Sequence, residues 1–210
     1  MRGQAHTLEG VAGALVVVVA VAFTLQATAV TPLTASTASQ HIETQHERAA
    51  SGLLEVERAN GNLSMALRYW NNSSGSFQNA DPDGYYVGQP ASPAVARNTS
   101  RPPNVSFFRA LEETFGGDQA VVYNVNAYYV DAFGERRLRR VVYNGQPSAD
   151  AVAATRLITV YDDQNVTTLS GGELVVSSTG PRLENATYFP ADVDGHAYSV
   201  VEIEVVVWRM

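Results

Sequence analysis

The sequence contains no cysteine and no lysine, and each absence restricts what the protein can be. Without cysteine there is no disulfide framework, no thiolate zinc site and no cysteine nucleophile. All 14 basic residues are therefore arginines, and 21 acidic residues outnumber them. The net charge of -7 argues against a nucleic-acid partner, because phosphate binding needs a net basic surface. An acidic, lysine-free chain rich in Ala, Val and Thr suggests a halophile, because acidic surfaces keep proteins hydrated in brine.

Recognisable catalytic motifs are also missing. The sequence has no nucleophile elbow, zinc-binding helix, P-loop or dinucleotide fingerprint. Among the histidines only His196 lies in the C-terminal half, and no serine elbow accompanies it. His41 and His46 are five residues apart, whereas metal-binding pairs on a helix prefer a spacing of four. We therefore predict a protein that is not an enzyme, with no catalytic residue, no metal site and no cofactor.

Two D-x-D-G stretches, at residues 81–84 and 192–195, have a spacing that can begin a calcium loop. Alternate carboxylates in a turn can face one ion, but a full loop needs further oxygen ligands and a bidentate Glu at its end. Both stretches lack these ligands. We interpret both as Asp-Gly turns.

The strongest indication of where the protein is located is the run from Gly10 to Val30, which has 21 residues and no charge. As a helix this run would reach about 30 Å, the thickness of one hydrocarbon core. Arg2 and the terminal amine precede it, and the next charge after Glu9 is Glu43. The positive-inside rule then predicts a short cytoplasmic leader at 1–9, a transmembrane helix at 10–30 and an extracellular remainder, in a single-pass protein of the cell membrane.

Three hypotheses account for this hydrophobic run. It can be a permanent anchor, or a signal peptide cleaved after Ala27-Thr28-Ala29 so that Val30 becomes the new N-terminus. The third hypothesis is a prepilin-type leader, in which a short peptide is removed and the hydrophobic helix is kept. Glu9 argues against a secretory signal, because a carboxylate beside the apolar run is costly unless it has a purpose.

The segment from Arg2 to Glu9 (RGQAHTLE) resembles the archaeal class III leader pattern, in which cleavage falls between Gly and Gln. It is also similar to the GQAHTLEG openings of haloarchaeal type IV pilin-like, or pseudopilin-like, membrane proteins. The resemblance covers roughly the first 35 residues. It implies cleavage between Gly3 and Gln4, which makes Glu9 the sixth mature residue where the fifth is usual. It also implies that Glu9 sets subunit registry by pairing with the N-terminal amine of a neighbouring copy.

A helical stalk is predicted over 31–72, and a loop rich in Asn, Ser, Gly, Asp and Pro over 73–104. The Asn60-Gly61-Asn62 sequence is expected to interrupt the stalk helix. Apolar residues spaced by three or four predict one buried seam, made of Ile42, Ala49, Leu53, Val56, Leu63, Leu67 and Trp70.

The remainder, 105–210, is predicted to be a β-rich extracellular head. A short helix at 107–115 precedes a hairpin of strands 121–129 and 136–144, joined at Ala132-Phe133-Gly134. Further strands are expected at 156–161, 173–177 and 198–208, the last with Val201, Ile203, Val205 and Val207 on one side. The fold class is α+β: a long N-terminal helix, hydrophobic then amphipathic, followed by a mainly antiparallel sheet, as in pilins.

Two surface features of the predicted extracellular part remain. The basic run Arg136–Arg140 fits an acidic partner, a neighbouring subunit or lipid headgroups, but a charged strand that discourages edge-to-edge pairing is the favoured interpretation. All N-glycosylation sequons follow the hydrophobic run and are candidate modification sites. They are Asn62, Asn71, Asn72, Asn98, Asn104, Asn165 and Asn185.

Taken together, these patterns predict a non-enzymatic, membrane-anchored surface protein, a pilin-like or pseudopilin subunit of a type IV pilus-like or secretion assembly. The expected partners are the membrane and copies of itself or related pilin-like subunits. The alternative is a single-pass anchored extracellular domain that binds a ligand or a surface component.

Overall fold

The computed structural model describes residues 2–117, 120–190, 192 and 196–210, apart from the side chains of residues 2–8, 26–38 and 93. The chain divides into two compact units, Met1–Thr44 and Gln45–Met210, which are described separately. We call the second unit the head.

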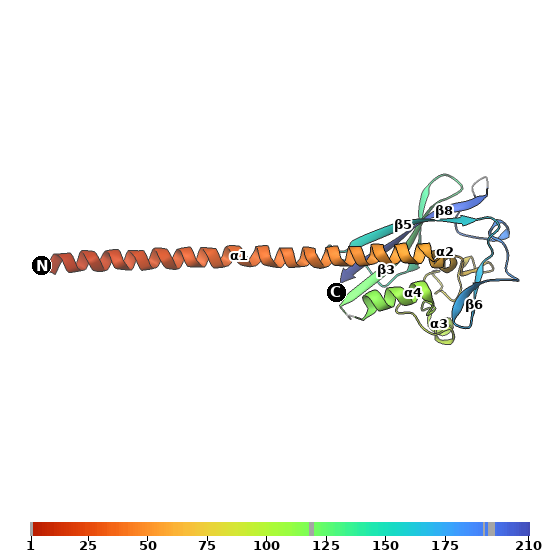
Figure 1. The fold of residues 1–210 in the computed structure, drawn as a ribbon, viewed down its shortest axis with the longest axis horizontal. Coiled ribbons are helices and arrows are strands. Elements are labelled where there is room, and N and C mark those ends of the chain that lie inside the picture. Colours follow the sequence, from red (N-terminus) through yellow and green to blue (C-terminus); the bar gives the residue numbers. More distant parts are fainter. Residues whose placement is uncertain (1, 118–119, 191, 193–195) are drawn as a thin grey trace. The chain divides into compact units, whose positions relative to one another are not determined.

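Helix α1 (Arg2–Ala59) provides every described residue of the first unit and continues into the head (Figure 1). Its backbone is helical across Thr31-Pro32. The large apolar side chains between Val11 and Leu25 are 53% to 74% exposed. Over the part of the chain that the structure describes, no helix has the length and apolar character needed to cross a membrane.

In its described residues the head contains short helices and three sheets. Its elements are α2 (Asn62–Leu67), β1 (Trp70–Asn71), β2 (Ser76–Phe77), α3 (Pro93–Thr99), α4 (Ser106–Leu111), the π-helical turn η1 (Glu112–Gly116), β3 (Val121–Val130), β4 (Arg136–Val142), β5 (Val152–Tyr161), β6 (Thr167–Ser170), β7 (Glu173–Val176), the 3-10 turn η2 (Leu183–Asn185) and β8 (Ala197–Arg209). The predicted loop at 73–104 thus also holds β2 and α3, and the predicted helix at 107–115 is α4 followed by η1.

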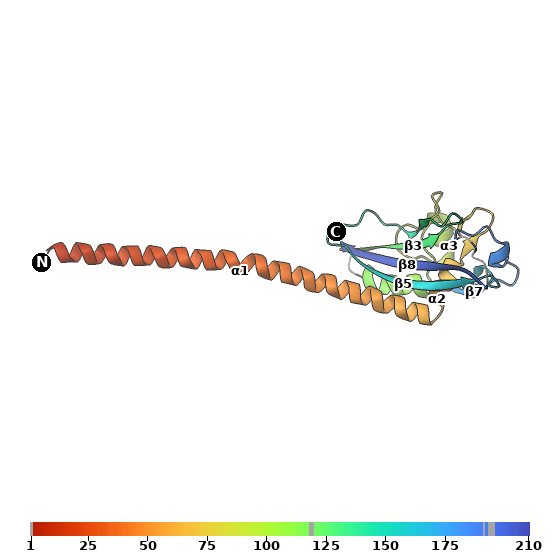
Figure 2. The same ribbon diagram turned by 90° about the horizontal axis from the view of Figure 1, so that it is seen from above.

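The main sheet has the strand order β4-β3-β8-β5, and every neighbouring pair is antiparallel. Figures 1 and 2 show β3, β8 and β5 running side by side through the head. The predicted hairpin is confirmed as β3 and β4, with a register shift between Val125 and Asn126. The β8 alternation is also confirmed, since Val201, Ile203, Val205 and Val207 are at most 1% exposed. The predicted strand 173–177 is β7, which pairs with β6 outside this sheet.

The interruption predicted at Asn60-Gly61-Asn62 is confirmed. Helix α1 ends at Ala59, and α2 begins at Asn62. Gly61 has a φ of 77° at the N-cap of α2, in the left-handed region that glycine enters without a Cβ clash. The turn lets two helices follow one another with both packed on the sheet.

The predicted seam is wrong at Val56, which is 56% exposed. The part of α1 in the head buries Ala50 and Leu54, both 0% exposed, and the next residue of that stripe is Glu57. Glu57 is 7% exposed, and its carboxylate accepts a hydrogen bond from Asn62 Nδ2 at 2.9 Å. Hydropathy alone therefore could not reveal this buried stripe, because one of its members, Glu57, is an acid. A buried carboxylate needs a hydrogen-bond partner, and here the partner belongs to the next helix.

An aromatic cluster around Trp70, which follows α2 in the chain, forms part of the core. The Trp70 ring lies 5.3 Å from Phe77, 5.4 Å from Tyr188 and 5.4 Å from Phe189, centroid to centroid. Trp70 Nε1 donates to the Thr187 carbonyl at 2.7 Å, so its polar edge is satisfied although the residue is 2% exposed. This cluster joins segments more than a hundred residues apart in the sequence.

Candidate functional site

The predicted assembly residues lie at the start of α1. Glu9 is exposed and directly precedes the exposed apolar side chains. Gly3 and Gln4 belong to α1, but their side chains fall outside the described residues, as do those of Ala27-Thr28-Ala29. Cleavage and subunit registry at these positions therefore stay predictions.

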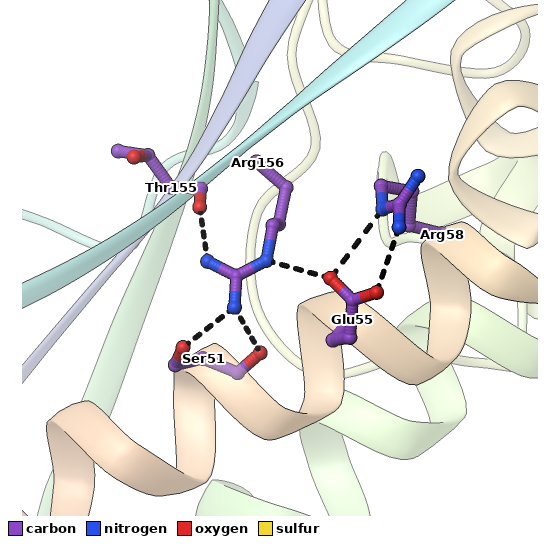
Figure 3. Close-up of polar contacts among 5 residues, drawn as sticks. All are labelled: Ser51, Glu55, Arg58, Thr155 and Arg156. Carbon is purple, nitrogen blue, oxygen red and sulfur yellow. Dashed lines mark hydrogen bonds and ion pairs between the residues drawn. The ribbon is translucent and has the colours of Figure 1, made fainter.

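A polar cluster attaches the last turns of α1 to strand β5, and sequence reasoning missed it (Figure 3). Arg156 Nε donates to Glu55 Oε2 at 2.9 Å, and its Nη2 donates to Ser51 Oγ at 2.8 Å. Its Nη1 donates to the carbonyl of the preceding residue, Thr155, at 2.7 Å. Arg58 Nη2 donates to the other carboxylate oxygen, Glu55 Oε1, at 2.7 Å and completes the cluster. The planar guanidinium suits this arrangement, because its donors leave the fork in fixed directions.

The pKa of Glu55 is lowered below its ordinary value of 4.5, first by the hydrogen bond from Arg58 and then by that from Arg156. A carboxyl with a depressed folded pKa stabilises the fold fully above its unfolded pKa, and this stabilisation is lost as the pH falls through the folded pKa. Glu55 therefore contributes to the stability of the head above about pH 4.5.

We expect Glu55→Gln to lower the free energy of unfolding at neutral pH and to flatten its decline below about pH 4.5. The measurement is urea denaturation of the full chain at a series of pH values between about 3 and 7. Glu113→Gln, at an exposed carboxylate of η1, is the matched control and should leave the acid dependence unchanged. Parallel pH curves for wild type and Glu55→Gln would contradict the assignment.

The basic run lies on β4, which is an edge of the main sheet. Each of its arginines is engaged within the head. Arg136 pairs with Glu202 at 3.1 Å, Arg137 with Asp131 at 2.7 Å, Arg139 donates to the Gly75 carbonyl at 2.8 Å, and Arg140 lies 4.1 Å from the Tyr143 ring centroid. This placement supports the interpretation of a charged edge that disfavours pairing with another sheet.

The candidate glycosylation sites fall into two groups. Asn62 Nδ2 donates to Glu57, and Asn165 Nδ2 donates to the Ser177 carbonyl at 3.0 Å. A glycan on either amide nitrogen would displace these hydrogen bonds. The remaining five side chains are exposed, and one of them also donates, from Asn185 Nδ2 to Glu184 Oε1 at 3.3 Å. These five are Asn71, Asn72, Asn98, Asn104 and Asn185.

Over the described ranges, no group of three or more His, Cys, Asp or Glu side chains is arranged to hold an ion. Asp81 Oδ1 instead accepts the backbone N–H of Tyr85 at 3.2 Å, which is the turn that we predicted there. The second D-x-D-G stretch includes residues 193–195, which lie outside the described residues.

The geometry defines an α+β protein in which N-terminal helices are followed by a four-stranded antiparallel sheet packed against α2. The chain belongs to DUF7288, a family of unknown function, whose profile matches residues 2–207. No curated protein and no solved structure matches the chain.

Proposed function

We propose that this protein is a non-enzymatic surface protein anchored in the cell membrane, and that it acts as a pilin-like or pseudopilin subunit. In this proposal the N-terminus is cytoplasmic and the head is extracellular. The observation that carries it is the apolar stretch from Val11 to Leu25, whose large side chains are more than half exposed along α1.

This stretch differs from a normal surface helix because it has no polar face. Valine, alanine, leucine and phenylalanine occupy all sides of it, so no rotation of α1 could hide them against a single partner surface. Contiguous exposed apolar surface of this kind marks a contact with lipid or with other protein chains. A bundle of like helices and a bilayer both satisfy this requirement.

The head gives independent support, because the described members of its core all come from the second unit. Its core contains Leu54, Phe108 and Val205, each 0% exposed, and every large side chain in it comes from residues after Gln45. The large apolar side chains from Val11 to Leu25 are exposed, as a helix that contacts lipid or neighbouring copies requires. A helix that inserts or bundles and a head that folds by itself are the two parts that a pilin-like subunit requires.

N-terminal sequencing of the protein purified from membranes tests the processing. A chain that begins at Gln4 is a processed pilin-like subunit, and one that begins at Met1 is an unprocessed anchor. A soluble monomer that begins at Val30 would refute membrane anchoring and assembly together.

Glu9→Gln is expected to weaken association between copies on the order of 30-fold or more, because removing one partner of a desolvated charge pair costs about 2–5 kcal/mol. The measurement is co-purification of two differently tagged copies from membranes, with the amount of membrane-bound protein as reference. Glu43→Gln, at the next acid of the same helix, should have no effect. Unchanged association of Glu9→Gln copies would overturn the registry role while leaving membrane anchoring intact.

A further inference from the structure

The two ends of the basic run on β4 differ in their partners. Arg136 and Arg137 each form an ion pair with a carboxylate, at 3.1 Å and 2.7 Å. In the part of the chain that the structure describes, Arg139 and Arg140 form no ion pair with any carboxylate. Two positive charges on this edge strand are therefore left without a counter-charge, although the chain as a whole is acidic.

Both of these arginines line a cavity of about 510 Å³ at the β4 edge of the main sheet. Its described lining consists of Asp83, Tyr85, Leu138, Arg139 and Arg140. The volume lies within the range of about 300–1,000 Å³ that is usual for small-molecule pockets. None of the five residues is buried, so a molecule in solution can reach them.

The guanidinium of Arg139 is held in place beside this cavity. Its Nη2 donates to the Gly75 carbonyl at 2.8 Å, and its Cζ lies 5.1 Å from the Trp70 ring centroid. Gly84 has a φ of 88°, and a Cβ added to it would lie 3.2 Å from Arg139 Nη2. Glycine therefore provides both the left-handed turn and the room for the guanidinium. Because Arg139 Nε is buried, Nη1 is the donor that remains for a ligand.

Aromatic side chains hold the guanidinium of Arg140. Its Cζ lies 4.1 Å from the Tyr143 ring centroid, and the Tyr143 ring meets the Tyr85 ring edge-on at 5.6 Å. The backbone N–H of Tyr85 donates to Asp81 Oδ1 at 3.2 Å, so this wall of the cavity is built on the Asp-Gly turn. A cation–π contact orients an arginine but leaves its positive charge available to an anion.

Asp83 is the acidic group of the lining, and it restricts which anions fit. Its Oδ2 accepts a hydrogen bond from Tyr85 Oη at 3.4 Å. A carboxylate accepts several hydrogen bonds, so Asp83 can also accept from a hydroxyl group of a ligand. It repels a ligand that is negative on every side, such as phosphate. The lining therefore favours a molecule with one negative group for the arginines and hydroxyl groups for Asp83.

We propose that this cavity binds a sugar acid of about monosaccharide size, with a single carboxylate. Arg139 and Arg140 are neighbours on a strand and leave it toward opposite faces, so they would donate to the carboxylate from two sides. The planar guanidinium matches the geometry of a carboxylate. A sugar hydroxyl would donate to Asp83, and the C–H surface would lie against Leu138, which is 47% exposed. The proposal does not depend on whether the chain assembles with other copies.

The test uses the full chain in a polyoxyethylene detergent at one fixed ionic strength, because salt screens exposed charges. Saturation-transfer NMR and calorimetric titration are recorded with D-glucuronate and D-galacturonate. D-Glucose, which lacks the carboxylate, and butyrate, which lacks the hydroxyl groups, are the comparison probes, together with inorganic phosphate. At least one uronate is expected to bind more tightly than all three comparison probes.

Arg140→Gln should weaken binding of that uronate by about tenfold or more, since it removes a hydrogen bond from a charged donor. Asp83→Asn should reduce the preference for the uronate over butyrate, because the negative charge that disfavours a plain anion is gone. Both side chains are exposed, and thermal denaturation without ligand checks that each variant is folded.

Arg182→Gln is the matched control, because Arg182 is also exposed and pairs with Glu184 at 3.7 Å, outside the cavity. It removes the same charge and should leave uronate affinity at the wild-type value. Absence of binding by both uronates would overturn the proposal, and so would binding of glucose, butyrate or phosphate as tight as that of the uronates. Equal affinities in wild type and Arg140→Gln, or equal losses in Arg140→Gln and Arg182→Gln, would overturn it as well.

Discussion

Leu54→Ala is expected to lower the free energy of unfolding of the head by about 2–5 kcal/mol, the usual cost of truncating a fully buried leucine. Leu54 is 0% exposed and belongs to the core formed by α1, α2, α4 and the main sheet. Removing its side chain leaves a cavity between the end of α1 and the strands. Neighbouring side chains can fill such a cavity only in part, because protein interiors are already close-packed.

Val56→Ala is the matched control, since Val56 lies two residues away on the same helix and is 56% exposed. Its expected effect is within about 0.5 kcal/mol, as for most surface substitutions. Guanidinium denaturation of the full chain, followed by tryptophan fluorescence, measures both. Trp70 and Trp208 are 2% and 5% exposed, so the signal reports unfolding of the head. Equal losses of unfolding free energy in the two variants would indicate that Val56 is buried, as hydropathy predicts. That result would contradict the packing of α1 seen in the structure.

Elements with a strong local period could be predicted from the sequence. The alternation of Val201, Ile203 and Val205 with Glu202 and Glu204 specifies a strand with one buried face, and β8 has that face. The β3–β4 hairpin is predictable because an alternating run over residues 121–129 is followed by a short turn with Gly134. Local patterns determine local structure, so these elements needed no knowledge of the rest of the chain.

The strand order could not be predicted in the same way. The last strand, β8, lies between β3 and β5, so it pairs with segments that end many residues earlier. Nothing in the sequence of β8 indicates which strands are its neighbours, because both of its edges carry only backbone donors and acceptors. The Arg156–Glu55 contact was hidden for the same reason, since it joins residues 101 positions apart.

The two kinds of candidate site differ in whether their residues can be identified from the sequence alone. Glu9 was found because a lone acid beside an apolar run is conspicuous without any fold. Glu55 and Arg156 carry no such signal, since a glutamate in a helix and an arginine in a strand are ordinary residues. What distinguishes them is that the fold brings the two side chains together, so that Arg156 Nε donates to Glu55 Oε2 at 2.9 Å. That property belongs to the folded chain and not to either residue.

A charge placed in the apolar stretch of α1 tests the membrane proposal directly. Val19→Arg is expected to disfavour insertion by about 2.5–3.5 kcal/mol, the cost of an arginine near the centre of a membrane helix. Val19 is 57% exposed, so the substitution disturbs no packing within the described chain. The expected result is a large fall in the fraction of protein that resists alkaline carbonate extraction from membranes.

Val200→Arg is the control for the added charge, because Val200 is 49% exposed on β8 in the head. It should leave the carbonate-resistant fraction at the wild-type level. Retention of Val19→Arg at that level would show that the apolar stretch is not inserted in lipid, and copies bundled through it would then have to account for its exposed surface. Loss of both proteins from membranes would instead indicate that surface charge of the whole chain governs its attachment. Only a loss confined to Val19→Arg supports a membrane-spanning α1, since that outcome depends on where along the chain the charge is placed.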